Sequence, residues 1–180
     1  MRHAAVLVTL LFTLLFPAVL SAQSTTSPEI FVRTGLVQLW DDEGNIGIGP
    51  SIGIGAGIRL PHGIAIEGLV ERHTNDRNFS SGVAFNSTVV GAAGRIAKYV
   101  GSSRTQPYFG GSAGITRVKT ISQFPGFPTN ERTTTSRTLG GFAGIRVAVG
   151  QRVFVRPEFE VSQAGEHLRI GGSVAAGFGW

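Results

Sequence analysis

Two glutamates near the end of the chain could perform acid–base chemistry. Glu158 and Glu160 are two residues apart, which on an extended strand places both carboxylates on one face, about 7 Å from each other. This separation falls within the range of inverting glycosidases. However, Arg156 flanks them on the same face, and other segments contribute further arginines. The pattern therefore favours a salt-bridge network, and we expect no catalytic residue and no enzyme activity.

Other groups that could bind metals, cofactors or nucleic acid lack the required spacing. His62, His73 and His167 show no metal-ligand spacing with a second histidine, so we expect no metal. The glycine-rich stretch 46–61 contains no Gly-x-Gly-x-x-Gly and no helix follows it, so we expect no nucleotide cofactor. The net charge of +5 is modest and has no dominant basic cluster, which argues against nucleic acid as a partner.

The charged residues belong to segments with the two-residue period of β-strands. Eight such segments are expected, at 30–40, 46–60, 64–73, 84–98, 108–119, 136–148, 153–162 and 168–180. Most are near or above the length of a tilted membrane strand, about 9 to 11 residues, and longer than ordinary soluble strands of about 5 or 6. The even number and short connections predict antiparallel neighbours.

The two faces of these strands differ in an unusual way. In the stretch 46–60, isoleucines such as Ile52 and Ile54 alternate with glycines such as Gly53 and Gly55. Small residues suit a crowded interior better than a surface in water, so we expect the apolar face to meet lipid. Because backbone groups in lipid must all pair, the sheet must close. The predicted fold class is all-β, an eight-stranded antiparallel up-and-down transmembrane β-barrel. A soluble lipocalin would need the inverse, an apolar lumen and a polar exterior.

Six arginines and four glutamates share the inward parity, for a net charge of +2. They are Arg33, Arg59, Glu67, Glu71, Arg95, Arg146, Arg156, Glu158, Glu160 and Arg169. An unpaired charge in a low-dielectric interior would cost several kcal/mol, so these arginines must bond glutamates, carbonyls or trapped water. Eight strands leave little width beyond such side chains. We therefore expect a mostly plugged lumen.

Three fragments resemble the small outer-membrane β-barrels of the outer-membrane protein A type. They are "QPYFGGSAGI" at 106–115, "VFVRPEFEV" at 153–161 and the terminal "VAAGFGW". The resemblance implies an outer-membrane location and an assembly signal at Phe178 and Trp180 that the barrel-assembly machinery reads. That signal usually carries glycine where this chain has Ala175.

The N-terminus has the layout of a secretory signal peptide. Arg2 precedes an apolar stretch from Ala4 to Phe16, and small residues lead up to Ala22. We expect residues 1–22 to direct export across the inner membrane and residues 23–180 to form the barrel domain in the cell outer membrane.

Four basic residues have outward parity near the predicted outer loops: Arg72, Arg117, Lys119 and Arg137. Simple snorkelling at the interface and contact with lipopolysaccharide phosphates are both open and are compatible. The outer loops are expected near 41–45, 74–83, 120–135 and 163–167. The longest contains "FPGFP" and is the expected contact surface.

The expected function is a structural or surface-interaction role for a monomeric barrel in contact with outer-membrane lipid and lipopolysaccharide. Two alternatives stay open: a narrow channel for small or hydrophobic solutes, and a barrel enzyme that modifies lipid A.

Overall fold

The computed structural model describes residues 26–41, 44–78, 84–101 and 103–180. The predicted signal peptide at 1–22 lies outside the described residues. No helix in these ranges is long and apolar enough to cross a membrane.

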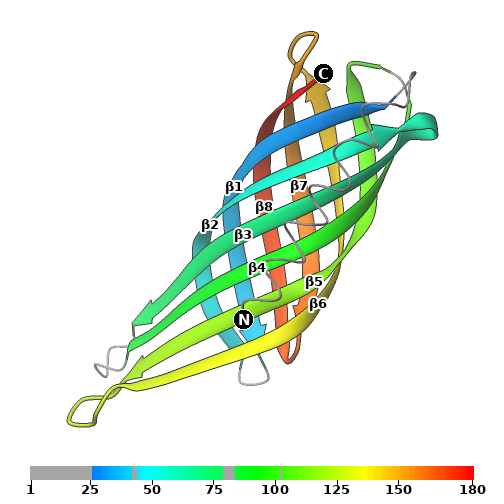
Figure 1. Cartoon of the computed structure of the whole chain (residues 1–180). Coiled ribbons are helices and arrows are strands. Elements are labelled where there is room, and N and C mark those ends of the chain that lie inside the picture. Colours follow the sequence, from blue (N-terminus) through cyan, green and yellow to red (C-terminus); the bar gives the residue numbers. More distant parts are fainter. Residues whose placement is uncertain (1–25, 42–43, 79–83, 102) are drawn as a thin grey trace.

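Eight antiparallel strands close into a barrel in which each strand pairs with its sequence neighbours and β1 pairs with β8 (Figure 1). The strands are β1 (Ser27–Asp41), β2 (Gly44–Leu60), β3 (Ile64–Asn78), β4 (Ala84–Tyr99), β5 (Thr105–Gln123), β6 (Asn130–Ala148), β7 (Val153–Ala164) and β8 (His167–Gly179). The 3-10 turn η1 (Pro61–Gly63) joins β2 to β3. We call the end where β1 begins and β8 ends the terminus end, and the opposite end the loop end. The predicted up-and-down barrel is confirmed.

The predicted extent of two outer loops is wrong, because the strands continue into them. β5 and β6 pair as far as Ser122 and Asn130, so the connection between them is 124–129 rather than 120–135. Likewise β3 reaches Asn78, which pairs with Ala84 of β4. Backbone groups in these stretches pair with each other, and β-branched residues such as Thr133 suit a strand. Figure 1 shows both hairpins projecting far beyond β1, β7 and β8.

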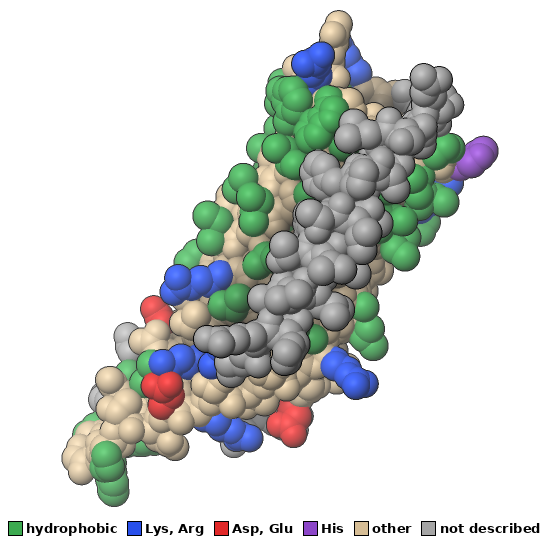
Figure 2. Space-filling view, in the orientation of Figure 1, with side chains coloured by type: hydrophobic (Ala, Val, Ile, Leu, Met, Phe, Trp, Pro, Cys, Tyr) green, Lys and Arg blue, Asp and Glu red, His purple; other side chains and the backbone are tan. Residues whose placement is uncertain are grey.

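Apolar side chains cover the outside of the barrel. Ile52 and Ile54 on β2 are 61% and 63% exposed, and Leu139 on β6 is 68% exposed, whereas Gly53 between the isoleucines is buried. Figure 2 shows apolar side chains along much of the visible face and charges of both signs gathered toward the loop end. We call this outer surface the apolar belt.

Inward glycines make room for aromatic rings from neighbouring strands. A Cβ added at Gly55 would lie 2.2 Å from the Phe31 ring, and one added at Gly177 would lie 2.3 Å from the Phe154 ring. The bare inner face of β2 and β8 is therefore filled by side chains of β1 and β7. The same rings lie against charged residues of the lumen: the Phe31 centroid is 4.4 Å from the Arg156 guanidinium, and the Phe154 centroid is 4.3 Å from that of Arg146.

Candidate functional site

The barrel interior holds all ten predicted lumen charges, arranged in three groups from the terminus end to the loop end. Alternation along each strand points every second side chain inward, and antiparallel pairing around the closed sheet brings charges from distant segments together.

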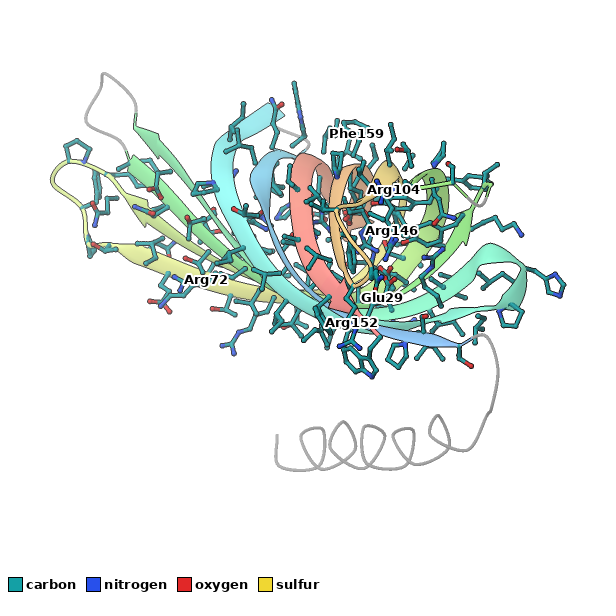
Figure 3. All side chains as sticks on the ribbon, turned by 90° about the horizontal axis from the view of Figure 1, so that it is seen from above. Glu29, Arg72, Arg104, Arg146, Arg152 and Phe159 are labelled. Carbon is teal, nitrogen blue, oxygen red and sulfur yellow. The ribbon has the colours of Figure 1, made fainter. Side chains whose placement is uncertain are left out.

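The terminus-end group centres on Glu29, which accepts a hydrogen bond from Arg146 at 2.9 Å. Arg59 lies 3.9 Å from the same carboxylate and donates to the Gln106 side chain at 2.8 Å. Figure 3 shows Glu29 and Arg146 close together. Sequence reasoning missed Glu29, because the first strand was expected to begin at residue 30. Glu29 has the same inward parity as Arg33, and this was the signal available in the sequence. Its negative charge lowers the net charge of the lumen from +2 to +1.

The central group is the most deeply buried. Arg95 lies 2.5 Å from Glu158 and 3.5 Å from Glu67, and the Arg95 side chain is 0% exposed. Arg156 donates to both carboxylate oxygens of Glu67 through separate nitrogens. The Tyr108 hydroxyl donates to Glu158 at 2.8 Å. Such bidentate and multiply bonded pairs are the strong form of the charge-assisted hydrogen bond.

Aromatic rings line this central group and face its cations. The Arg95 guanidinium lies 3.8 Å from the Phe142 ring centroid, and that of Arg156 lies 4.4 Å from the Phe31 centroid. Tyr99 and Tyr108 stack with centroids 4.9 Å apart. The rings stabilise desolvated cations through their electron-rich faces. Their inward parity could be read from the sequence, but no role followed from it.

The loop-end group centres on Arg33. Its guanidinium lies 2.9 Å from Glu160, 3.2 Å from Glu158 and 3.4 Å from Glu71, and Arg169 donates to Glu71 at 2.7 Å. Arg33 thus joins this group to the central one through Glu158. The predicted carboxylate pair of Glu158 and Glu160 is bridged by the guanidinium of Arg33. Glu158 pairs with Arg95 as well, so the two carboxylates belong to a salt-bridge network.

Beyond Arg33 the lumen becomes less charged. A cavity of about 30 Å³, lined in part by Glu71, Thr116, Thr138 and Glu160, has room for about one or two water molecules. The Thr116 and Thr138 hydroxyls are 2.6 Å apart. Further out, Leu39, Val89 and Val118 form a buried apolar cluster.

Two of the histidines considered as metal ligands lie in different surroundings. His73 is 1% exposed and points into the lumen, whereas His62 is exposed in η1. No group of three or more His, Asp or Glu side chains within the described ranges could hold a metal ion.

The predicted outward basic residues lie on the outer face at the loop end. Arg72 on β3, Arg117 on β5 and Arg137 on β6 are exposed, and Figure 3 shows Arg72 pointing away from the barrel. Lys119 pairs with Glu131 at 2.9 Å. At the other end, the predicted assembly residues Phe178 and Trp180 are exposed, with ring centroids 6.0 Å apart.

Comparisons with known proteins find similar structures but no sequence relatives. No protein-family model and no curated protein matches the chain. Among solved structures, Neisserial surface protein A is 18% identical with a TM-score of 0.67, over 86% of this chain and 99% of that one. Ail, the attachment invasion locus protein of Yersinia pestis, solved with the heparin analogue sucrose octasulfate, is 11% identical with a TM-score of 0.66, over 87% and 100%.

A third structure extends the same pattern to a domain of a different protein. The N-terminal β-barrel domain of Pseudomonas aeruginosa OprF is 13% identical with a TM-score of 0.53, over 86% of this chain and 97% of that domain. These likenesses confirm that the chain has the fold of the small outer-membrane barrels, as its sequence fragments indicated. At such low identity they describe the fold alone.

Proposed function

We propose that this protein is an integral outer-membrane barrel with a closed lumen, which acts through its outer surface and catalyses no reaction. The observation that carries the proposal is the filling of the lumen by ion pairs. One group surrounds Glu29 at the terminus end, and a second set, linked through Glu158 and Arg33, runs from Glu67 to Arg169 toward the loop end.

The apolar belt supports insertion into a membrane. Exposed side chains on it include Ile52, Phe109, Ile115, Leu139 and Phe159, each 55% exposed or more. Monomeric soluble proteins rarely expose contiguous apolar patches larger than a few hundred Å². In a closed barrel all backbone polar groups of the strands pair with each other, so such a surface can lie in lipid. Export by residues 1–22 and assembly through Phe178 and Trp180 complete this proposed route to the outer membrane.

The lumen charges support a plug rather than a pore. Arg95, Arg156 and Glu67 each bond more than one partner, so movement of any of these three side chains breaks at least two buried contacts. Removing one partner of a buried pair costs about 3 to 5 kcal/mol. Glu158 is bound by Arg33, Arg95 and the Tyr108 hydroxyl. These contacts leave it unsuited to acid–base catalysis, which supports a non-enzymatic role.

The loop end supports contact at the cell surface. With an even number of strands and both chain ends at the terminus end, the long hairpins point outward from the cell. The tip of the β5–β6 hairpin carries Phe124 and Phe127, which are 44% and 75% exposed. Ail, which shares the fold, is named for attachment and invasion. We propose that these hairpins form the contact surface and that the barrel is monomeric.

Fractionation and gel electrophoresis test the location. The protein should appear in the outer-membrane fraction, and its band should shift between unboiled and boiled samples. A soluble protein, or a band that does not shift on boiling, would contradict the proposal.

Planar bilayers test the closed lumen. The purified barrel should give small or rare conductance events. A large and steady conductance would instead favour the narrow-channel alternative, and altered lipid A in expressing cells, detected by mass spectrometry, would favour the enzyme.

A further inference from the structure

The outer face of β3, β4, β5 and β6 at the loop end carries three tiers of different chemistry. In order toward the loop end, these tiers are the edge of the apolar belt, a group of cations and a polar hollow. The cross-strand register fixes their relative positions.

The cationic tier contains three arginines close together. Arg72 on β3 and Arg117 on β5 are both paired with Val90 of the strand between them, which places their Cα atoms about 10 Å apart. Arg137 on β6 is paired with Ile115, so it is a diagonal neighbour of Arg117 at about 7 to 8 Å. We call these three residues the arginine triad. Arginine side chains can bridge such distances to converge on one headgroup.

The acidic neighbours of the triad leave it with excess positive charge. Glu131 pairs with Lys119, which lies two residues beyond Arg117 on the same face of β5. Asp76 lies four residues beyond Arg72 on the same face of β3, about 13 Å away on an extended strand. Counting Lys119, the region holds four cations and two anions.

Below the triad lies an apolar surface that suits acyl chains. Val70, Val90 and Ile115 are 53%, 46% and 58% exposed. Val90 shares a row with Arg72 and Arg117, and Ile115 is next to Arg137 across the strand pair. The triad therefore sits at the border of the apolar belt.

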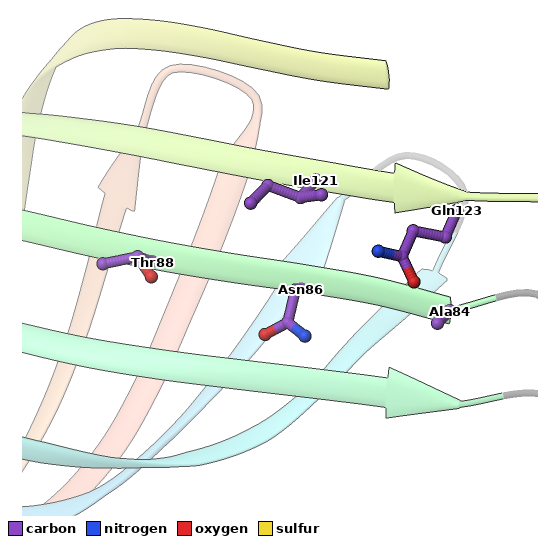
Figure 4. Close-up of a pocket in the computed structure, with 5 residues that line it drawn as sticks. All are labelled: Ala84, Asn86, Thr88, Ile121 and Gln123. Atoms are coloured by element: carbon purple, nitrogen blue, oxygen red, sulfur yellow. The ribbon is translucent and has the colours of Figure 1, made fainter. Parts of the chain in front are cut away.

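Above the triad lies a hollow of about 140 Å³ between β4 and β5, shown in Figure 4 and lined by Ala84, Asn86, Thr88, Ile121 and Gln123. Two amides and one hydroxyl supply both donors and acceptors there. Thr88 is paired with Lys119, so the hollow is continuous with the cationic tier. Along β4 the outward side chains thus change from polar to apolar within a few residues.

We propose that this face binds a phosphorylated glycolipid, with sugar hydroxyls in the hollow, phosphates on the arginine triad and acyl chains on the apolar belt. Arginine favours phosphate because its guanidinium can form two parallel hydrogen bonds. A phospholipid offers phosphate and acyl chains but no sugar for the hollow. The inference rests on the proposed outer-membrane location and names the lipid that this surface selects.

Lipid competition tests the site with the refolded full-length barrel. The protein in detergent is mixed with equal amounts of diphosphorylated lipid A and phosphatidylglycerol, and the bound lipids are measured by native mass spectrometry. The wild type should retain lipid A preferentially. The triple variant Arg72→Gln, Arg117→Gln, Arg137→Gln should retain about tenfold less lipid A, as expected for losing three partly exposed charge pairs.

A matched control changes basic residues at the opposite rim. Arg104 and Arg152 are exposed at the terminus end and are labelled in Figure 3. Replacing both by Gln should leave lipid A retention within about twofold of wild type, since neither contacts the proposed site. Equal loss in this control and the triple variant would overturn the site, because it would indicate a general effect of net charge.

A second variant tests the sugar tier independently of the arginines. Asn86→Ala with Gln123→Ala should lower the preference for lipid A over phosphatidylglycerol while leaving phosphatidylglycerol retention unchanged. If this variant keeps the full preference, or if the wild type retains both lipids equally, the arginines only snorkel and the proposal fails.

The same preparations separate this inference from the proposed function. A barrel that shifts on boiling and conducts little, yet shows no lipid preference, overturns the lipid site alone. A barrel that fails to fold in detergent or conducts strongly overturns the proposed function.

Discussion

Glu158 links the central and the loop-end groups of lumen charges, because it contacts Arg95, Arg33 and the Tyr108 hydroxyl. Each contact crosses the lumen from a different strand. Loss of this single carboxylate would therefore leave two buried guanidinium groups, those of Arg33 and Arg95, with one charged partner fewer each. The stability of the plug depends on multiply shared residues of this kind.

Replacing Glu158 and Glu160 together by Gln should loosen the plug. Arg33 and Arg95 lose charged partners, which should lower the free energy of unfolding by about 3 to 5 kcal/mol or raise conductance in planar bilayers. Urea titration of the band shift measures the first and single-channel recording the second. Glu131→Gln is the control, because its pair with Lys119 is exposed and such pairs are worth about 0 to 1 kcal/mol. A double variant that matches wild type in both assays would contradict the plugged lumen.

Gly55→Ala should destabilise the barrel by overpacking. The new methyl group would lie 2.2 Å from the Phe31 ring and 2.8 Å from the carbonyl oxygen of Gly68, so the cost is expected at about 1 to 3 kcal/mol. Gly111→Ala is the matched control, because its nearest neighbour would be a carbonyl oxygen at 3.7 Å on the outer face. Unfolding in urea, followed by tryptophan fluorescence, compares the two. Equal stability of both variants would show that Phe31 does not need the space over Gly55.

The strands at the loop end of β3 to β6 are longer than the apolar belt requires. The paired rows continue through Lys119 and Thr133 to Ile121 and Glu131, and three of these four outward side chains are polar or charged. Backbone hydrogen bonds suffice to extend a hairpin once its first rows are anchored in a barrel. The hollow shown in Figure 4 lies on this projecting sheet, further toward the loop end than the exposed Val90.

An arginine on the outer face should cost more at the centre of a strand than at its end. Ile54→Arg, at a side chain 63% exposed on the belt, should lower stability by about 2 to 4 kcal/mol in lipid vesicles. Thr105→Arg is the control, since it has the same outward orientation at the first residue of β5, and its cost should be about 0 to 1 kcal/mol. Equal costs at the two positions would mean that this face does not meet lipid.

In the closed barrel, the C-terminal strand β8 completes the sheet. β8 pairs with both β7 and β1, so closure depends on the final residues of the chain. Phe178 is paired with Ile30 of β1 and with Val153 of β7. Recognition of these residues during assembly is a different step from their stability once paired.

Deleting Trp180 should impair assembly more than stability. Trp180 follows β8 and its ring is 55% exposed, so few contacts of the folded barrel are lost. In cells with limited expression, the amount of barrel in the outer membrane should fall, while refolding into detergent should change little. Quantified band shifts in both settings measure this. Normal assembly in cells would remove the argument for a C-terminal signal.

The sequence alone determined the number of strands, the direction in which their side chains point and ten of the charges that enter the lumen, although Glu29 was missed. These properties follow from a period of two, which is local and repeats in every segment. The glycine-rich inner face of β2 could also be read in this way. The sequence likewise indicated that the outer face is apolar and that the chain must close.

Only the tertiary structure decided which charges meet and how far the strands extend. Arg156 pairs with Glu67 across a separation of 89 residues, and Arg146 pairs with Glu29 across 117. Such partners depend on the register of every strand pair around the barrel, which no local pattern specifies. The reach of β5 and β6 to Gln123 and Asn130 was likewise hidden, because pairing with a neighbour, rather than the propensity of one segment, holds those residues extended.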